Sequence, residues 1–535
     1  MKVKQLRVFA RSAVLELADG GTYYTKKPYR VLVNGAEAKT ADTVITSLFD
    51  LKPATDYEVR ILDGEEEVGS TSFTTDEEFV TLNVRTFGAA GDGVQDDTTF
   101  IQAAILAAPE KSRVLVPAGT YKIRPLFLKS GLRLELAKGA ELQADTDRSH
   151  FPKFPGLIES WDEKSEYNLG TWEGNPLEMF AGVITGIGCK DVILYGEGTI
   201  NGCATKENWW NNPKVMRGAW RPRLVFLSHC EGVTLQGITC CNSPSWTLHP
   251  YFTNDLHFYN VNVENPADSP NTDGLDPESC KDVTIEGVRF SLGDDCIAVK
   301  SGKIYMGKKY KTPTENLHIR QCLMENGHGA VTVGSEMAGG VRNMTVEDCI
   351  FRRTDRGLRI KTSRGRGEDA ILDGITFRNI DMDHVMTPFV VNCFYFCDPD
   401  GKTPYVQSRE VYPVDDRTPV AKKFVFENIH ATNCHVAVAH FDGLPEKKIE
   451  EIVLRNVDVS FAENPKSGVP AMSEGVEACS KKGLFARNVK KLVLDNISID
   501  GQVGEAMIIE GVDEVVRVRR DSFDCREISQ SITAK

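Results

Sequence analysis

Carboxylates, a histidine and two cations are concentrated in four short motifs near the middle of the chain. The motifs are Asn271-Thr272-Asp273, Gly293-Asp294-Asp295, Gly327-His328-Gly329 and Arg359-Ile360-Lys361. Aspartates that lie close together cannot all ionise at equal cost, so the pKa of one of them should rise. A protonated carboxylic acid beside ionised carboxylates is the combination that cleaves a glycosidic bond. The four motifs can do this chemistry only if the fold brings them together.

Each motif also has an ordinary structural explanation. A Gly-Asp pair such as the one before Asp295 is common in turns, and a lone histidine such as His328 is more often structural than catalytic. Arg359 and Lys361 could belong to a solvated, salt-bridged face. On a strand, both cations point to one side while Ile360 points into the core. We favour the functional interpretation because the motifs occupy comparable positions in a repeat.

From about residue 190 onward, a short run of alternating apolar residues recurs. Its copies begin at Val192, Val233, Leu256, Val283, Leu317, Met344, Ile375, Phe424, Ile452 and Leu492, about 23–50 residues apart. Alternation with a period of two indicates strands. A strand-bearing repeat of irregular length, with no regular helix between copies, predicts an all-β parallel β-helix in which each copy is one coil.

The repeat also predicts which residues are neighbours in space. Asp273 lies 17 residues after Leu256, Asp294 and Asp295 lie 11 and 12 after Val283, His328 lies 11 after Leu317, and Arg359 and Lys361 lie 15 and 17 after Met344. Coils stack about 4.8 Å apart, so these side chains should form one column. By the same register, Cys322 and Cys349 should stack inside. Five asparagines should share a turn position that tolerates a left-handed backbone, namely Asn260, Asn379, Asn428, Asn456 and Asn496.

Residues 1–78 differ from the repeat and predict a small β-sandwich that precedes the β-helix of residues 79–535. Alternating strands are expected at residues 31–33, 57–61 and 72–75. The run Leu51-Lys52-Pro53-Ala54-Thr55-Asp56-Tyr57 resembles the tyrosine corner of fibronectin type III domains. After an acidic linker, a short helix should begin at Asp96 or Asp97 and end before Pro109, where it could cover the open end of the sheet.

Composition excludes several classes of protein. With 63 Lys and Arg against 76 Asp and Glu, the net charge is −13, which argues against a nucleic-acid partner. No segment approaches the about 20 apolar residues of a membrane span. The 14 cysteines form no Cys-x-x-Cys pair, so a structural zinc site is not expected. The N-terminal residues show no secretory leader, so a cytoplasmic location is expected.

In this order, the four motifs resemble the signature of family 28 glycoside hydrolases, the polygalacturonases, over the chain from about residue 80 to its end. The resemblance implies a right-handed, pectin-lyase-like parallel β-helix that hydrolyses galacturonic-acid chains with inversion and without metal or other cofactor. It implies that Asp294 is the general acid, that Asp273 and Asp295 activate water, and that His328 supports this proton arrangement.

The resemblance also suggests residues that bind the substrate, a galacturonic-acid oligosaccharide or polysaccharide. Arg359 and Lys361 would hold a uronate carboxylate. Tyr395 would lie one coil further on, and Asn271 belongs to the first motif. Trp246 and His249 precede Asp273 by one coil and would form sugar-binding walls, although plain core packing explains Trp246 equally well. We retain Asn271, Tyr395, Trp246 and His249 as candidate substrate-binding residues.

Weaker features favour cleavage from a chain end. The segment Gly334-Ser335-Glu336-Met337-Ala338-Gly339-Gly340 is similar to one found in exo-acting members, and a fibronectin-like domain also precedes the β-helix in bacterial exo-enzymes. Insertions at residues 145–190, 202–224 and 393–422 could block one end of a groove. The alternatives are a rhamnogalacturonan-type galacturonohydrolase, a calcium-dependent β-helix lyase and a carbohydrate-binding β-helix without catalysis.

Overall fold

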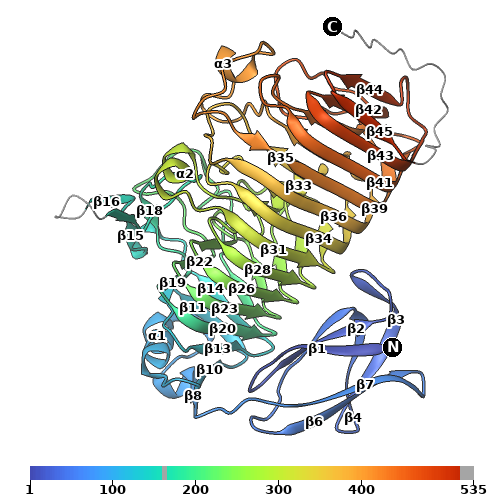
Figure 1. Ribbon diagram of the computed structural model, residues 1–535. Helices are drawn as coiled ribbons and strands as arrows, with labels where there is room; N and C mark the ends of the chain where they lie inside the picture. The colour runs from blue at the N-terminus through green and yellow to red at the C-terminus, as the bar shows by residue number, and fades with distance from the viewer. Residues whose placement is uncertain (160–165, 519–535) are drawn as a thin grey trace. The chain divides into compact units, whose positions relative to one another are not determined.

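The computed structural model describes residues 1–159 and 166–518 (Figure 1). These residues form two compact units. The first comprises residues 1–294, 316–323 and 348–350, and the second comprises residues 295–315, 324–347 and those from 351 onward. The fold is a right-handed parallel β-helix preceded by a small β-sandwich, as the sequence predicts. No helix in the described part of the chain is long and apolar enough to cross a membrane.

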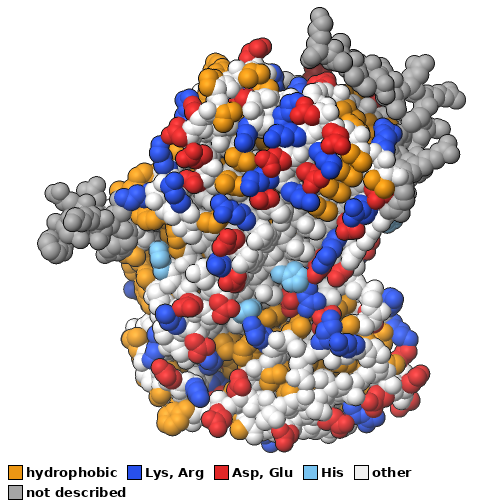
Figure 2. Space-filling view, in the orientation of Figure 1, with side chains coloured by type: hydrophobic (Ala, Val, Ile, Leu, Met, Phe, Trp, Pro, Cys, Tyr) orange, Lys and Arg blue, Asp and Glu red, His pale blue; other side chains and the backbone are white. Residues whose placement is uncertain are grey.

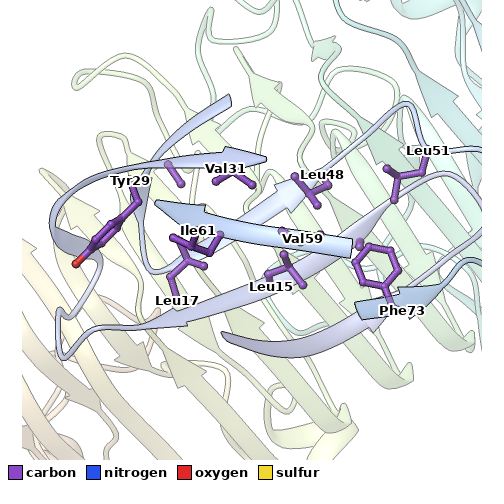
Figure 3. Packing of buried hydrophobic residues seen from close by; sticks show 11 residues of the cluster. Leu15, Leu17, Tyr29, Val31, Leu48, Leu51, Val59, Ile61 and Phe73 are labelled. Atoms are coloured by element: carbon purple, nitrogen blue, oxygen red, sulfur yellow. The ribbon is translucent and has the colours of Figure 1, made fainter. Parts of the chain in front are cut away.

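The N-terminal sandwich consists of two antiparallel sheets. One contains β1 (Lys2–Val8), β2 (Ala13–Ala18) and β5 (Ile45–Leu48), and the other has the order β4 (Ala36–Thr43), β3 (Tyr24–Val33), β6 (Asp56–Asp63), β7 (Glu66–Thr74). Apolar side chains from both sheets, including Leu15, Val31, Val59 and Phe73, pack into one core (Figure 3). The strands predicted at residues 31–33, 57–61 and 72–75 therefore lie in β3, β6 and β7, with residue 75 just beyond the end of β7.

A short cap connects the sandwich to the coils. It contains β8 (Thr81–Asn83), the 3₁₀ turn η1 (Val84–Phe87), β9 (Asp92–Asp96) and helix α1 (Thr98–Ala107), which ends two residues before Pro109. The predicted capping aspartates act differently from one another. Asp97 occupies the N-cap position, but its carboxylate accepts from the N–H groups of Ala90 and Gly91 instead of the helix. Asp96 accepts from the N–H of Thr98 at the helix start.

Three sets of parallel strands form the coils of the first unit. The first set is β10 (Arg113–Val116), β13 (Arg133–Leu136), β20 (Lys190–Gly196), β23 (Glu231–Gln236), β26 (Asn254–Tyr259), β28 (Lys281–Glu286) and β31 (Thr314–Arg320). The second is β11 (Gly119–Ile123), β14 (Ala140–Ala144), β21 (Thr199–Asn201), β24 (Thr239–Cys241), β27 (Asn262–Glu264), β29 (Arg289–Ser291) and β32 (Leu323–Glu325). The third is β12 (Leu126–Phe127), β19 (Ile184–Ile187), β22 (Val225–Ser228) and β25 (Leu248–Tyr251).

Two sets of parallel strands form the second unit. A seven-stranded sheet has the order β30 (Asp295–Val299), β33 (Gly329–Val333), β35 (Arg356–Lys361), β37 (Thr387–Asn392), β40 (Ala437–Asp442), β42 (Lys482–Arg487) and β44 (Met507–Glu510). The other set is β34 (Val341–Arg352), β36 (Ile371–Asp383), β38 (Val420–Ala421), β39 (Lys423–Cys434), β41 (Ile449–Phe461), β43 (Val489–Asp500) and β45 (Glu514–Arg517). Helices α2 (Ile304–Tyr310) and α3 (Pro404–Gln407) lie in the connections.

The strand register follows the predicted repeat. In the first unit, Val192, Val233, Leu256 and Val283 are successive partners. In the second, Ile375, Phe424, Ile452 and Leu492 are successive partners in the same way. Cys322 and Cys349 are buried, and the N–H of Cys322 donates to the sulfur of Cys349 at 3.5 Å, so their predicted stacking is confirmed.

The insertions between coils carry the irregular structure. Residues 160–165 of the insertion at 145–190 lie outside the described part of the chain, and the remainder includes two antiparallel pairs. These pairs are β15 (Lys153–Phe154) with β18 (Met179–Phe180) and β16 (Leu157–Glu159) with β17 (Glu166–Asn168). Acidic and basic side chains are interspersed over the face drawn in Figure 2, so the net charge of −13 is not gathered into one patch there.

Candidate active site

Asp273 and Asp294 lie together in the first unit. The carbonyl of Asp273 accepts from the N–H of Thr247 at 2.8 Å, and Leu275 then forms a parallel bridge to Leu248 at the start of β25. This bonding fixes Asp273 in the turn before the third strand position of its coil. Asp273 is buried and Asp294 is partly exposed, and a carboxylate oxygen of one lies within 4.8 Å of one from the other. The two carboxylates therefore lie close enough to act on one substrate.

Asp295 begins β30 in the second unit, where it is buried and paired with both predicted cations. Nη1 of Arg359 lies 3.0 Å from one carboxylate oxygen, and Nζ of Lys361 lies 2.8 Å from the other. Ile360 between them is fully buried, which confirms the predicted alternation along β35. Burial by itself would raise the pKa of Asp295. The charges of Lys361 and Arg359, with a smaller contribution from His328, outweigh it and hold the pKa well below its usual range.

The glycine after His328 leaves space for Thr332 and for the Asp295 carboxylate. Gly329 is the register partner of Asp295 across β30 and β33. A Cβ atom on Gly329 would lie 2.3 Å from Oγ1 of Thr332 and 2.9 Å from Oδ1 of Asp295. Any larger residue would therefore displace the Thr332 hydroxyl first, and the Asp295 carboxylate with it. His328 itself is exposed and directly precedes β33.

Tyr395 lies beside the same cations. It follows β37, and its N–H donates to the carbonyl of Thr362 at 3.1 Å. Nζ of Lys361 lies 5.7 Å from the centre of the Tyr395 ring, close enough for a cation–π interaction. Burial is the main cause of the raised pKa of its hydroxyl, which therefore remains protonated at neutral pH. Tyr395 therefore lies one coil beyond Arg359 and next to Lys361.

Trp246 and His249 are buried rather than presented to solvent. His249 has no exposed surface, its Nε2 lies 2.8 Å from Glu278, and its Nδ1 accepts from Arg223 at 3.2 Å. The guanidinium of Arg223 lies 4.3 Å from the centre of the Trp246 ring. Both predicted sugar-binding walls are therefore occupied by protein contacts, which supports the core-packing interpretation of Trp246 and gives His249 a structural position.

Asn271 has an arginine partner that sequence reasoning missed. Nη2 of Arg221 donates to Oδ1 of Asn271 at 2.7 Å, and Nη1 donates to the carbonyls of Pro244 and Pro270. The guanidinium also lies 5.3 Å from the centre of the Trp172 ring. Burial is the main cause that lowers the pKa of Arg221, to about 9. The Arg-Pro-Arg sequence at 221–223 was the only sequence feature that pointed to this arginine. It lies in the insertion at 202–224, where the repeat gives no prediction of spatial neighbours.

A second group of charges beyond β30 and β33 was also missed. Lys300 pairs with Glu336 at 3.0 Å, and Lys303 lies 3.4 Å from the same carboxylate and also pairs with Asp398. Burial raises the pKa of Glu336, but Lys300, Lys303 and Lys361 lower it well below its usual value. The sequence indicated a segment of interest at residues 334–340, but it did not predict that Glu336 pairs with these lysines. The network fixes the segment that follows β33.

The donor set limits the cofactors that these residues could hold. Asp273 and Asp294 offer two carboxylates, whereas Ca²⁺ takes six to eight oxygens in proteins. Both oxygens of Asp295 are already paired with Arg359 and Lys361. The arrangement therefore suits proton transfer more than the binding of a calcium ion.

The chain is similar to two known families and to several known proteins. The family Glycosyl hydrolases family 28 matches residues 108–476, and Rhamnogalacturonase A/epimerase, pectate lyase-like, matches residues 81–134. A probable polygalacturonase of Vitis vinifera is 29% identical over 74% of this chain and 77% of its own. An endo-polygalacturonase of Pectobacterium carotovorum is 28% identical over 68% of this chain and 84% of its own.

Among solved structures, a family 28 exopolygalacturonase of Yersinia enterocolitica has the same fold, with a TM-score of 0.68. It covers 96% of this chain and 98% of its own, at 17% sequence identity. The match of the family to residues 108–476 includes all the carboxylates and cations described above. The chain belongs to glycosyl hydrolases family 28 and is a glycoside hydrolase.

Proposed function

We propose that this hydrolase cleaves α-1,4-galacturonosyl linkages of galacturonan, from a chain end and with inversion. The observation that carries the proposal is the buried Asp295, which Arg359 and Lys361 keep ionised. An enzyme that hydrolyses glycosides needs such a permanent carboxylate close to a carboxylic acid. Cations in the same place also suit a substrate that carries a carboxylate on every sugar unit.

The proposed roles follow from the environments of the three aspartates. Asp294 is partly exposed and close to Asp273, so a substrate can reach it, and we assign it the role of the acid that donates a proton to the leaving oxygen. The peptide bond to Asp294 keeps Asp295 beside the acid. Because its cations also reduce its basicity, Asp295 orients the attacking water as a hydrogen-bond acceptor, and Asp273 takes the proton. His328 remains an exposed group that supports this proton transfer.

Inversion is the part of the proposal that distances support least. Inverting pairs are usually about 6.5–9.5 Å apart, whereas the nearest oxygens of Asp273 and Asp294 lie within 4.8 Å. Inversion therefore rests on the family resemblance. Proton NMR of the first product decides it, because an α-linkage should yield the β-anomer. Initial formation of the α-anomer would contradict inversion and leave the hydrolase assignment intact.

Cleavage from a chain end is supported by the long insertions at residues 145–190, 202–224 and 393–422. A digest of polygalacturonate should lose viscosity slowly relative to the release of reducing ends. Monogalacturonate or digalacturonate should be the early product. A rapid loss of viscosity with a ladder of oligomers would show internal cleavage instead.

Two other substrates or reactions are distinguished by the same assay. The match of residues 81–134 to the rhamnogalacturonase and pectate lyase-like family favours rhamnogalacturonan as a second candidate substrate. Faster hydrolysis of rhamnogalacturonan than of polygalacturonate would establish it. Unsaturated products and loss of activity with a chelator would indicate a calcium-dependent lyase.

We also propose that residues 1–78 form a fibronectin type III-like domain. Its support is the division into sheets β1-β2-β5 and β4-β3-β6-β7. The hydroxyl of Tyr57 accepts from the N–H of Lys52 at 2.7 Å, which is the bond of a tyrosine corner. Replacement of Tyr57 by Phe should remove this bond and lower the stability of the sandwich by about 1 kcal/mol, measured by urea unfolding of the whole chain.

A further inference from the structure

The face of the seven-stranded sheet that presents Arg359 and Lys361 continues onto the next coils. Across β35, β37 and β40, Arg359 is level with Val390 and then His440. Lys361 is level with Asn392 and then Asp442 in the same way. Side chains at equal register share one face of a sheet. A sugar chain that extended along the coils beyond Arg359 would therefore have to lie over these residues.

That face is covered from β37 onward. The exposed fractions of Val390 and Asn392 are 2% each, and those of His440 and Asp442 are 6% and 0%. The cover includes residues 469–474, which we call the strap. The guanidinium of Arg356 donates to the carbonyl of Val469 at 2.5 Å, which anchors the strap at the start of β35.

The strap is also anchored over β37 and to the insertion at 393–422. The amide of Asn392 donates to the carbonyl of Met472 at 3.1 Å, and the N–H of Phe396 donates to the same oxygen at 3.2 Å. The N–H of Glu474 donates to the side chain of Gln407 at 2.9 Å. These bonds join residues about 65 to 115 positions apart in sequence and give the strap a defined position.

The strap reaches the predicted substrate-binding arginine. Nη2 of Arg359 lies 2.7 Å from the sulfur of Met472, while Nη1 is paired with Asp295 at 3.0 Å. The Met472 side chain thus lies against the side of the guanidinium that is not paired with the carboxylate. On the same coil Lys361 lies against the ring of Tyr395.

We propose that the strap closes the sugar-binding surface at the coil of Arg359, and that Met472 is a specificity-determining residue. The inference rests on the proposed function, and it names the strap as the segment that blocks one end of the sugar-binding surface. Coils rise about 4.8 Å, comparable to the length of one pyranose unit, so blocking β37 leaves room for a single unit at Arg359 and Lys361. That unit is the terminal uronate of the chain.

The first test uses the unmodified enzyme with hexagalacturonate labelled at its reducing end. If the surface ends at Arg359, monogalacturonate is the only first product, and it comes from one end, which the label identifies. First products of two or more sizes would overturn the closed surface, although they would still show a galacturonan hydrolase. Failure to hydrolyse any galacturonide would instead contradict the proposed function.

The second test replaces Met472 with alanine. The Met472→Ala enzyme should gain several-fold in the ratio of kcat/KM for hexagalacturonate to kcat/KM for digalacturonate, and should begin to release digalacturonate. The matched control is Met507→Ala, a partly buried methionine on β44, the last strand of the same sheet, which should leave the ratio unchanged. An unchanged ratio in a folded Met472→Ala enzyme would overturn the role of Met472.

Discussion

The three aspartates have different surroundings, and a test of the acid belongs to Asp294. It is the partly exposed member, whereas Asp273 and Asp295 are buried. Replacement of Asp294 by Asn should lower turnover by about 10²–10⁴-fold, because the amide cannot donate the proton that a carboxylic acid supplies. Release of reducing ends measures the loss, and circular dichroism checks the fold. Near-normal activity in a natively folded variant would exclude Asp294 as the acid.

Lys361 controls the ionisation of Asp295. Burial, the largest effect on the pKa of Asp295, raises it, and Lys361 is the first of the cations that reverse this. In Lys361→Met the pKa should rise, so the acidic limb of the profile of kcat/KM against pH should move to higher pH. A matched Lys138→Met variant, which removes an exposed cation, should leave the limb in place. An unmoved limb in Lys361→Met would mean that catalysis does not require ionised Asp295.

The same shift affects stability with a defined sign. Asp295 has a lowered pKa in the folded protein, so its ion pairs contribute stability above its unfolded pKa of about 3.9 and lose it as the pH falls through the folded value. The native enzyme should therefore keep this contribution well into the acid range. Lys361→Met should lose the corresponding part at higher pH, which thermal unfolding at several pH values measures.

At the scale of the elements, the turns between strands are held by stacked asparagines. Asn379, Asn428, Asn456 and Asn496 all have left-handed backbones, as predicted. The amides of Asn428, Asn456 and Asn496 each donate to the asparagine of the preceding coil, at 3.0, 2.8 and 3.1 Å respectively. Asn260 shares the conformation but binds the sandwich instead, through the carbonyl of Ile45 and the hydroxyl of Ser47.

This ladder predicts an unequal response to two substitutions. Asn456→Ala should destabilise the protein by about 1–3 kcal/mol, because alanine loses two hydrogen bonds and strains a left-handed backbone. Asn456→Gly should cost less, since glycine adopts that backbone without strain. Urea unfolding compares the two. Equal losses would show that the side-chain ladder alone, and not the backbone conformation, determines the position.

At the scale of the whole molecule, the sandwich is docked on the coils of the first unit. Glu16 pairs with Lys4 at 2.8 Å and with Arg320 at 2.9 Å, and Arg320 also pairs with Glu286. Val14, Val44 and Ile45 pack with Tyr259 of β26. Substitution of a larger residue for Gly237 would clash with Phe49, because an added Cβ would lie 2.4 Å from its ring.

Removal of residues 1–78 should therefore affect stability more than catalysis. None of the catalytic or substrate-binding candidates lies in that segment, so a chain that starts at residue 79 should keep its kcat. It should melt at a temperature lower by a few degrees or more, because Tyr259 and the Glu286–Arg320 pair lose their cover. In the full chain, Arg320→Gln should lower the melting temperature by less. A large loss of kcat in folded truncated protein would show that the sandwich shapes the site.

Local repetition explains how much the sequence determined by itself. In a parallel β-helix each coil stacks on the one before it, so a period-two pattern and residue offsets are enough to predict the strands, the inward cysteines and the asparagine turns. The four motifs carry the catalytic candidates at such offsets. Gly329, opposite Asp295, shows the limit of this reasoning, because no residue offset records that a side chain there would clash with Thr332 and Asp295.

Contacts made by segments outside the repeat could be found only from the tertiary structure. Met472 meets Arg359 across 113 residues, and Glu16 meets Arg320 across 304. Their positions depend on loops of irregular length that pack against a finished surface. Burial also changed the interpretation of His249. It was a candidate sugar-binding residue, but in the structure it accepts a hydrogen bond from Arg223 inside the protein. Repeated strand positions follow from sequence because each is local, whereas a strap or a docked domain depends on packing between distant segments that no spacing records.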